Sequence, residues 1–147
     1  MGTEINIVSG FLEAGKTSFI NRILHSGLVK KNERVLVLLC EQGPEKLHSK
    51  SMVPEEIYYK VIQSKQELQR ALFSRVGTRY FPDRIFIEYN GTWEISELLE
   101  IKLPANYHFG PIIHLVDGST FNIYMSNMGL LMWEQISNCD WVILNRY

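Results

Sequence analysis

The stretch G-F-L-E-A-G-K-T, Gly10 to Thr17, decides the fold of this 147-residue chain. It follows a short apolar run, Ile5 to Ser9, and opens a segment in which apolar residues recur at helical spacing, Lys16 to Ser26. A glycine-rich turn between a strand and a helix, closed by Lys-Thr, is the pattern of a phosphate-binding loop, or P-loop. The sequence therefore predicts a nucleotide-binding domain with an α/β fold.

Each fixed position of this loop has a chemical role. Gly10 and Gly15 allow backbone angles and a close approach that side chains would block, so backbone N–H groups can point at phosphate oxygens. The first turn of the helix adds further N–H donors. Lys16 is expected to reach the β- and γ-phosphates, and the Thr17 hydroxyl to ligate Mg²⁺. Three further residues of the loop and first turn are predicted to contact the nucleotide: Glu13, Ala14 and Ser18.

Apolar runs alternate with helical patterns along the rest of the chain. Strands are predicted at 34–39, 58–62 (an edge strand), 84–88, 112–117 and 141–144, and helices at 64–79, 95–100 and 120–137, the last interrupted near Gly129. A long polar loop is expected from Cys40 to Pro54, and Ser64 with Glu67 forms a capping box. This alternation predicts a three-layer P-loop NTPase fold, with a mostly parallel sheet and helices on both faces.

Composition argues against several classes of protein. Fifteen basic and 16 acidic residues give a net charge of −1, so no basic excess is available to bind nucleic acid. The longest apolar run, Val35 to Cys40, is strand-sized, and no membrane span, membrane partner or signal peptide is expected. Cys40 and Cys139 are expected to be free thiols of a cytoplasmic protein. One domain is predicted over 1–147, truncated at its C-terminal end because the chain stops just after a core strand.

Two predicted strands end in a carboxylate that could hold Mg²⁺ opposite the P-loop. Glu88 closes R-I-F-I-E, and Asp117 closes I-I-H-L-V-D. Ligands of such sheets bind at the carboxyl ends of the strands, so both acids are well placed. We favour Glu88, because Gly91 follows it at the E-x-x-G spacing and its N–H could contact the γ-phosphate.

Several stretches resemble a known family. The segment I-N-I-V-S-G-F-L-E-A-G-K-T-S-F-I-N-R-I-L, residues 5–24, closely resembles the opening of the CobW-type GTPases, relatives of the HypB and UreG metallochaperones. P-D-R-I-F-I-E-Y-N-G, residues 82–91, resembles the E-x-x-G strand of that family, and V-D-G-S-T-F, residues 116–121, its V-D-A segment. E-Q-I-S-N-C-D-W-V-I-L-N-R, residues 134–146, resembles the stretch that ends in the guanine-reading N-K-x-D.

The resemblance implies a Mg²⁺-dependent GTPase, with Lys16, Glu41 and Glu88 as its catalytic set. Glu88 would share the Mg²⁺ site with Thr17. Glu41 matches the acidic residue of the family's N-E-x-G switch loop, which lies near the γ-phosphate and could help to orient the attacking water. Asn145 would contact the guanine edge, so GTP is favoured over ATP. A client metalloprotein is implied as a partner, and the oligomeric state stays open, with a dimer among the alternatives.

The chain departs from the family pattern at three places. Cys40 stands where the family usually has Asn, and Arg146 where it usually has Lys. No Cys occurs from Gln42 to Ile87, where the family usually carries C-x-C-C, so a thiolate site for Zn²⁺ or another late metal cannot be built there. Cys40, Glu41 and His48 would make only a poorer site.

Three functions follow from these observations. The first is a slow GTPase in a metal-chaperone or metallocentre-assembly protein, whose switch loop would order around the γ-phosphate. The second is a nucleotide-dependent interaction module with little or no turnover, which the altered switch loop and the missing cysteines favour. The third is an ATPase of the same fold.

Overall fold

One parallel sheet forms the centre of the molecule. The computed structural model describes residues 2–11, 14–41 and 52–146. Six strands of this part pair in the order β3-β2-β4-β1-β5-β6, and every neighbouring pair is parallel. The strands are β1 (Thr3–Ser9), β2 (Arg34–Leu39), β3 (Glu56–Val61), β4 (Arg84–Glu88), β5 (Tyr107–Asp117) and β6 (Trp141–Asn145). As predicted, β3 lies at an edge of the sheet, and β6 forms the other edge.

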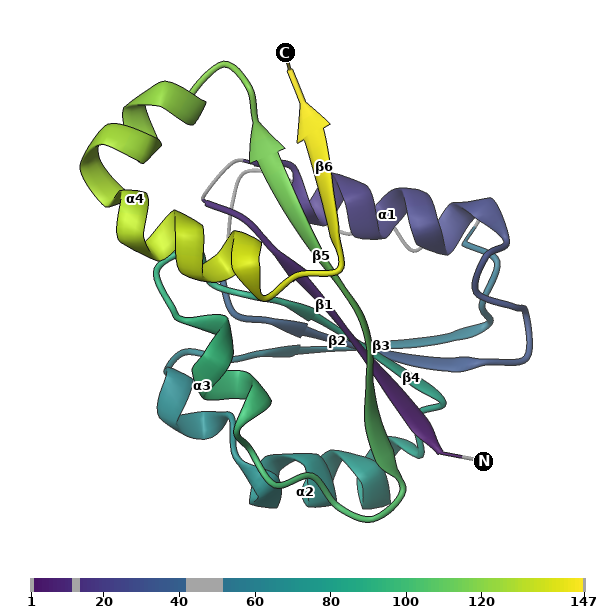
Figure 1. Ribbon diagram of the computed structural model, residues 1–147. Helices are drawn as coiled ribbons and strands as arrows, with labels where there is room; N and C mark the ends of the chain where they lie inside the picture. The colour runs from purple at the N-terminus through teal and green to yellow at the C-terminus, as the bar shows by residue number, and fades with distance from the viewer. Residues whose placement is uncertain (1, 12–13, 42–51, 147) are drawn as a thin grey trace.

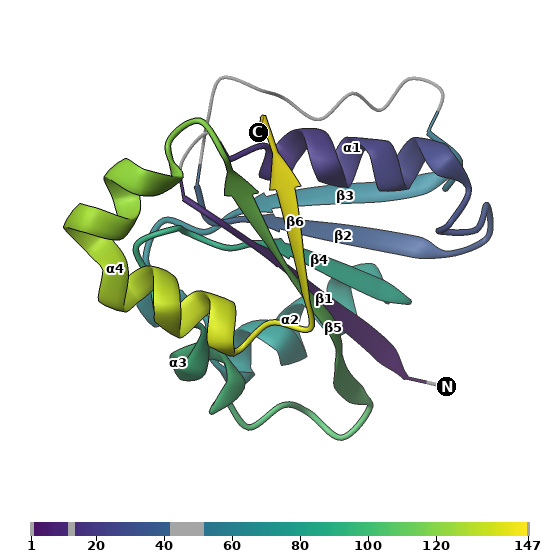
Figure 2. The ribbon, with the colours of Figure 1, turned by 45° about the horizontal axis from the view of Figure 1, so that its top comes forward.

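Helices cover both faces of this sheet (Figure 1). Helix α1 (Lys16–Ser26) lies on one face, and α2 (Arg70–Tyr80) and α3 (Ile95–Leu99) lie on the other. The last helix, α4 (Phe121–Ser137), contacts β5 and α3, and Figures 1 and 2 both show it away from α1. This arrangement confirms the predicted three-layer P-loop fold. No helix in the described part of the chain is long and apolar enough to cross a membrane.

Successive side chains of the strands enter two separate cores. The core on the α1 side includes Val8, Ile20, Leu24, Val35, Val37 and Phe86. The core on the α2 and α3 side includes Ile5, Ile7, Leu36, Leu38, Leu72, Phe73, Val76, Ile85, Ile87 and Ile95. Because both faces of the central strands are buried, these strands have continuous apolar sequences instead of alternating ones.

The helix predicted from Ser64 to Arg79 is wrong, because the chain forms two helices there. The capping box is present, and the Glu67 carboxylate accepts a hydrogen bond from the Ser64 N–H at 3.1 Å. It closes only a 3₁₀ turn, Lys65–Glu67. Leu68 then leaves the helical conformation (φ −79°, ψ 88°), and its side chain is buried in the core. Burial of this leucine interrupts the helical pattern, and α2 begins two residues later.

The strand β5 and the helix α4 are both irregular. β5 starts at Tyr107, earlier than the predicted residue 112, and its pairing with β1 shifts register between Ile5 and Ile7. Pro111, which cannot donate a backbone hydrogen bond, lies at that shift. In α4, Met128 has non-helical angles (φ −136°, ψ 35°), which confirms the predicted interruption near Gly129.

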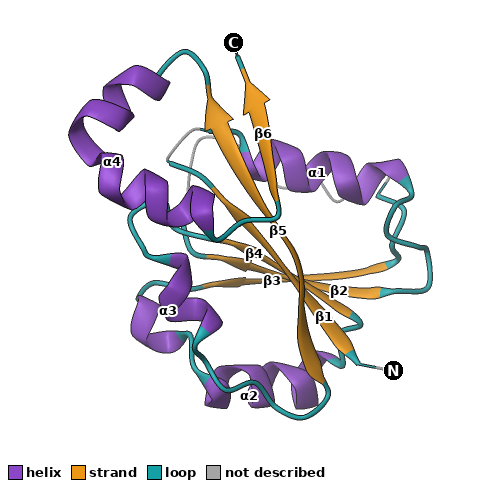
Figure 3. Ribbon diagram, in the orientation of Figure 1, coloured by secondary structure: helices purple, strands orange, loops and turns teal. Residues whose placement is uncertain are grey.

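The strands that lead into the candidate site are neighbours in the sheet. β4 lies between β1 and β2, and Glu88 at its end is in register with both Val8 and Leu39. The strands point the same way (Figure 3), so the segments that follow β1, β2 and β4 emerge together. These segments carry the P-loop, Glu41 and Gly91. Residues far apart in the sequence therefore meet at the carboxyl ends of these strands.

Candidate nucleotide-binding site

The two glycines of the turn between β1 and α1 have the backbone conformation that a phosphate cradle needs. Gly10 (φ 143°) and Gly15 (φ 102°) both lie in a region that side chains disfavour. No side chain of the described residues caps α1 where it begins at Lys16, so an anion could bind its first N–H groups. The remaining residues predicted for this loop are Ala14 and Ser18, which lie on the turn and the first turn of α1, and Glu13, which lies outside the described residues.

The Lys16 ammonium group lies inside this turn. Its side chain is only 3% exposed, and Nζ donates a hydrogen bond to the Gly10 carbonyl at 2.5 Å. Nζ also forms an ion pair with Oε1 of Glu41 at 2.5 Å. The other Glu41 oxygen accepts a hydrogen bond from the Gly91 N–H at 3.0 Å. The Glu41 carboxylate thus holds the two donors, Lys16 and Gly91, that the sequence predicts for the γ-phosphate.

Thr17 and Glu88 lie against each other beside the lysine. The Thr17 hydroxyl is 2.9 Å from each Glu88 carboxylate oxygen, and Glu88 is only 3% exposed. Burial raises the pKa of Glu88, while the Thr17 hydrogen bond and the charge of Lys16 act in the opposite direction. A hydroxyl next to a carboxylate is an all-oxygen donor set of the kind Mg²⁺ prefers. The residues present therefore fit a Mg²⁺ ion.

Asp117, the alternative acid, binds other partners. Its Oδ2 lies 3.0 Å from Nη1 of Arg146, and its Oδ1 accepts hydrogen bonds from the backbone and hydroxyl of Ser119. Burial pushes the pKa of Asp117 upward, but the bonds from Ser119 and Arg146 outweigh it and hold this pKa below its usual value. In the described part of the chain, the acid in contact with Thr17 is Glu88.

The end of β6 approaches the P-loop from the other side. Nδ2 of Asn145 lies 3.5 Å from the Ala14 carbonyl, and a Cβ on Gly15 would lie 3.0 Å from the same nitrogen. The predicted base-contacting residue is therefore adjacent to the predicted phosphate cradle, as binding of one nucleotide across both would require.

Comparison with known families agrees with this geometry. The profile of the CobW/HypB/UreG nucleotide-binding domain matches residues 4–147. The chain belongs to this family. The resemblance read from the sequence is thereby confirmed, and so is nucleotide binding as the role of the domain.

A solved structure shares the fold of this CobW/HypB/UreG domain. A Zn(II)-bound triple mutant of the YjiA GTPase superposes with a TM-score of 0.65 at 17% sequence identity. The match covers 98% of this chain and 49% of that one, so the chain spans about half the length of its structural neighbour. At this identity the likeness supports the fold alone. A comparison with curated protein sequences finds no match.

The cysteines of this CobW/HypB/UreG domain are both free, as predicted. Cys40 is buried, and burial together with the charge of Glu88 raises the pKa of its thiol, which keeps it neutral. Within the described ranges, no group of three or more His, Cys, Asp or Glu side chains could hold a metal ion. His48, the third member of the poorer metal site considered with Cys40 and Glu41, lies outside those ranges, as does most of the predicted switch loop.

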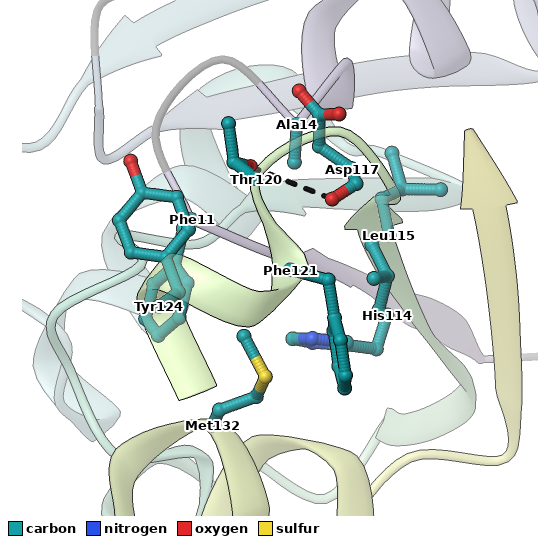
Figure 4. Close-up of a pocket in the computed structure, with 10 residues that line it drawn as sticks. Phe11, Ala14, His114, Leu115, Asp117, Thr120, Phe121, Tyr124 and Met132 are labelled. Atoms are coloured by element: carbon teal, nitrogen blue, oxygen red, sulfur yellow. Dashed lines mark hydrogen bonds between the residues drawn. The ribbon is translucent and has the colours of Figure 1, made fainter. Parts of the chain in front are cut away.

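No sequence motif indicates that His114 lies behind the phosphate cradle. This residue of β5 is 1% exposed, and its Nδ1 is 2.8 Å from the Ser9 hydroxyl at the end of β1. Figure 4 shows the ring among the residues that line a small pocket between the P-loop and α4, with Phe11 and Tyr124 opposite. No local sequence signal could indicate this contact, because the pairing of Ser9 with His114 depends on the sheet register.

Burial makes His114 a source of pH-dependent stability. Desolvation, helped by the nearby charge of Lys16, lowers the pKa of His114 from 6.5 to about 4. The unfolded chain therefore binds a proton at a pH where the folded chain does not. The stabilising contribution is fully present above pH 6.5 and is lost as the pH falls toward 4. We expect this loss to be about 3 kcal/mol, because one pKa unit corresponds to 1.36 kcal/mol.

Urea unfolding across this pH range measures the effect. His114→Asn should remove about 3 kcal/mol of the dependence of unfolding free energy on pH. His108→Asn is the matched control, because the His108 side chain is 58% exposed. Equal pH dependences of the parent and His114→Asn would contradict a neutral, buried His114.

Proposed function

We propose that this domain binds and slowly hydrolyses GTP with Mg²⁺, as part of a CobW-like metal-chaperone or metallocentre-assembly protein. The observation that supports this most directly is the pair of contacts made by Glu41. A carboxylate bridges the P-loop lysine and the Gly91 N–H, so an anion already sits between the donors proposed for the γ-phosphate. A terminal phosphate is also negatively charged, and it has more acceptor oxygens than a carboxylate.

Lys16, Gly91 and the start of α1 would hold the triphosphate. The ammonium group of Lys16 stabilises charge that develops on the transferring group, and the N–H groups of the loop fix its position. The γ-phosphate competes with the Glu41 carboxylate for Lys16 and Gly91 and displaces it. Glu41 then stays close to the terminal phosphate and can orient the attacking water.

Thr17 and Glu88 would hold the Mg²⁺ ion. When bound, the ion neutralises charge on the β- and γ-phosphates. The buried Glu88 carboxylate is the charge that attracts the ion, and the Thr17 hydroxyl, already within hydrogen-bonding distance of both Glu88 oxygens, supplies a second oxygen ligand.

Membership of the family favours GTP over ATP, with Asn145 at the base edge. In this proposal the nucleotide state controls contact with a client metalloprotein, and the protein works in the cytoplasm, where its two free cysteines remain reduced. In this proposal the domain forms part of a longer chain, which agrees with a match that covers 49% of the structural neighbour. The oligomeric state stays open, with a dimer among the alternatives.

An interaction module with little turnover is the second candidate. The observation in its favour is the same Glu41 bridge, because both oxygens of this carboxylate are already engaged, one by Lys16 and one by Gly91. An ATPase of the same fold is the third. Both alternatives keep the phosphate cradle and differ from the first in turnover or base preference.

Nucleotide binding and phosphate release separate the three functions. Mg-GTP at 100 times its dissociation constant should add about 2.7 kcal/mol to the free energy of unfolding. With EDTA in place of Mg²⁺ this gain should shrink, because the Thr17 and Glu88 contacts to the ion are lost. Phosphate release from GTP but not ATP supports the GTPase, and release from ATP the ATPase. Tight binding without release supports the interaction module, and no stabilisation by either nucleotide rejects all three.

A further inference from the structure

Helix α4 contacts both of the loops proposed to hold phosphate. Its first half touches the P-loop, since the rings of Tyr124 and Phe11 lie 4.6 Å apart between centroids. Its second half touches the segment that begins at Gly91, through the side chains of Glu134 and Gln135. The non-helical Met128 lies between the two halves. One element thus joins the P-loop and the Gly91 segment, with a break between its two points of contact.

The second half of α4 is attached to the Gly91 segment by four hydrogen bonds. Nε2 of Gln135 donates to the carbonyls of Gly91 at 3.3 Å and Trp93 at 2.8 Å. The Glu134 carboxylate accepts from the backbone N–H groups of Ile95 and Ser96, each at 2.8 Å, where α3 begins. A displacement of Gly91 would therefore be transmitted directly to residues 129–137.

Gly91 connects Gln135 to Glu41, the acidic residue of the predicted switch loop. Its N–H donates to Glu41, and its carbonyl accepts from Gln135. When a γ-phosphate replaces Glu41, the N–H of Gly91 changes acceptor, and any shift of the Gly91 backbone toward the phosphate pulls on Gln135, which holds the carbonyl of the same residue. Gln135 is fully buried, so we expect it to move together with its helix.

Gln135 is also incompletely paired in this state. Its Oε1 is buried and has no hydrogen-bond partner among the described residues, although its two donor contacts fix which way the amide points. A buried, unpaired amide oxygen is costly and is rare in folded proteins. A second arrangement of these contacts could give this oxygen a partner.

We propose that α4 senses the γ-phosphate, with Gln135 and Glu134 as positioning residues that couple Gly91 to residues 129–137, and with Met128 as the hinge. This proposal rests on the proposed function, because it needs a triphosphate to displace Glu41. It goes beyond that function by naming the element that moves and the two side chains that move it.

A fluorophore on α4 tests the coupling. Leu130 is 91% exposed, so Leu130→Cys in a Cys139→Ser background accepts an environment-sensitive thiol label, while Cys40 stays buried. With Mg²⁺ present, the emission should differ between GDP and the slowly hydrolysed GTPγS. The same label on Leu28→Cys, also exposed but just beyond the C-terminal end of α1, should give no such difference.

Gln135→Met should abolish the emission difference at position 130. It should also weaken GTPγS binding roughly three- to tenfold, the effect of losing one net hydrogen bond, and leave GDP binding unchanged. Glu134→Gln, which keeps the size of the side chain but replaces one carboxylate oxygen, should reduce the difference as well and serves if Gln135→Met does not fold. Asn127→Leu is the matched control, because it removes an exposed amide on the same helix.

The outcomes separate this inference from the function on which it rests. Binding of both nucleotides with equal emission at position 130 overturns the coupling and leaves the proposed function standing. Persistence of the emission difference in both Gln135→Met and Glu134→Gln overturns the role of these side chains. Absence of binding to either nucleotide overturns the proposed function and the coupling together.

Discussion

Replacing Lys16 with alanine should weaken triphosphate binding by about 30-fold or more, since truncating a buried, hydrogen-bonded charge typically costs about 2–5 kcal/mol. The ammonium group is 3% exposed and lies within 2.5 Å of both the Gly10 carbonyl and Glu41. No other cation in the described residues pairs with Glu41, so the variant leaves a carboxylate in the space where a phosphate must bind. Isothermal titration with GTPγS measures the loss, and phosphate release should vanish with it.

The control for this variant is another lysine in an ion pair. Lys65 pairs with Glu97 at 3.1 Å, but both side chains are more than two-fifths exposed. Such surface pairs contribute little, so Lys65→Ala should bind GTPγS like the parent. Circular dichroism shows whether Lys16→Ala is folded, and therefore whether a loss of binding reflects the site or the fold. A folded Lys16→Ala protein that binds GTPγS like the parent would show that the buried ammonium does not contact the phosphates.

The chemistry of the phosphate cradle could be read from the sequence, because its signals are local. Gly10, Gly15, Lys16 and Thr17 stand at fixed spacing between a strand and a helix, and the structure keeps that order. The contact of Thr17 with Glu88, 71 positions away, could also be predicted from the sequence. Parallel strands that end side by side bring their following residues together, and only the choice between the two strand-end acids needed an additional argument.

The bridge made by Glu41 could not be foreseen from the sequence. A resemblance placed this acid near the γ-phosphate, but its partners depend on charge compensation in a buried space. Lys16 is almost fully buried, and a buried ammonium group must find an anion. In this state Glu41 is the anion it finds.

The contacts of α4 could not be predicted from the sequence either. Gln135 has no sequence signal, because its position depends on the break at Met128 and on the packing of α4 beside β5. The same applies to His114, whose pairing with Ser9 follows from a register shift upstream in β5. Tertiary context of this kind also ended the helix predicted from Ser64, where a leucine turned into the core.

Replacing Gly91 with alanine should damage both stability and triphosphate binding. A Cβ at this position would lie 2.6 Å from Cα of Phe11 and 2.7 Å from the Gly10 carbonyl oxygen. Both are backbone atoms of the P-loop, so no side-chain rotation can relieve the contact, and the two loops must separate. We expect a loss of about 1–3 kcal/mol in the free energy of unfolding, as overpacking usually costs, measured by urea titration.

The same displacement moves the Gly91 N–H away from the lysine, so GTPγS binding should fall about tenfold or more, the effect of losing a hydrogen bond to a charged group. Gly27→Ala is the matched control. Gly27 has a positive φ of 89°, but a Cβ there meets nothing within 4 Å, so the variant adds backbone strain far from the loops and should bind GTPγS normally. Because Gly91 is not among the residues with positive φ, its substitution tests contact alone. Parent-like binding by Gly91→Ala would mean that the close approach of the two loops does not set the phosphate site.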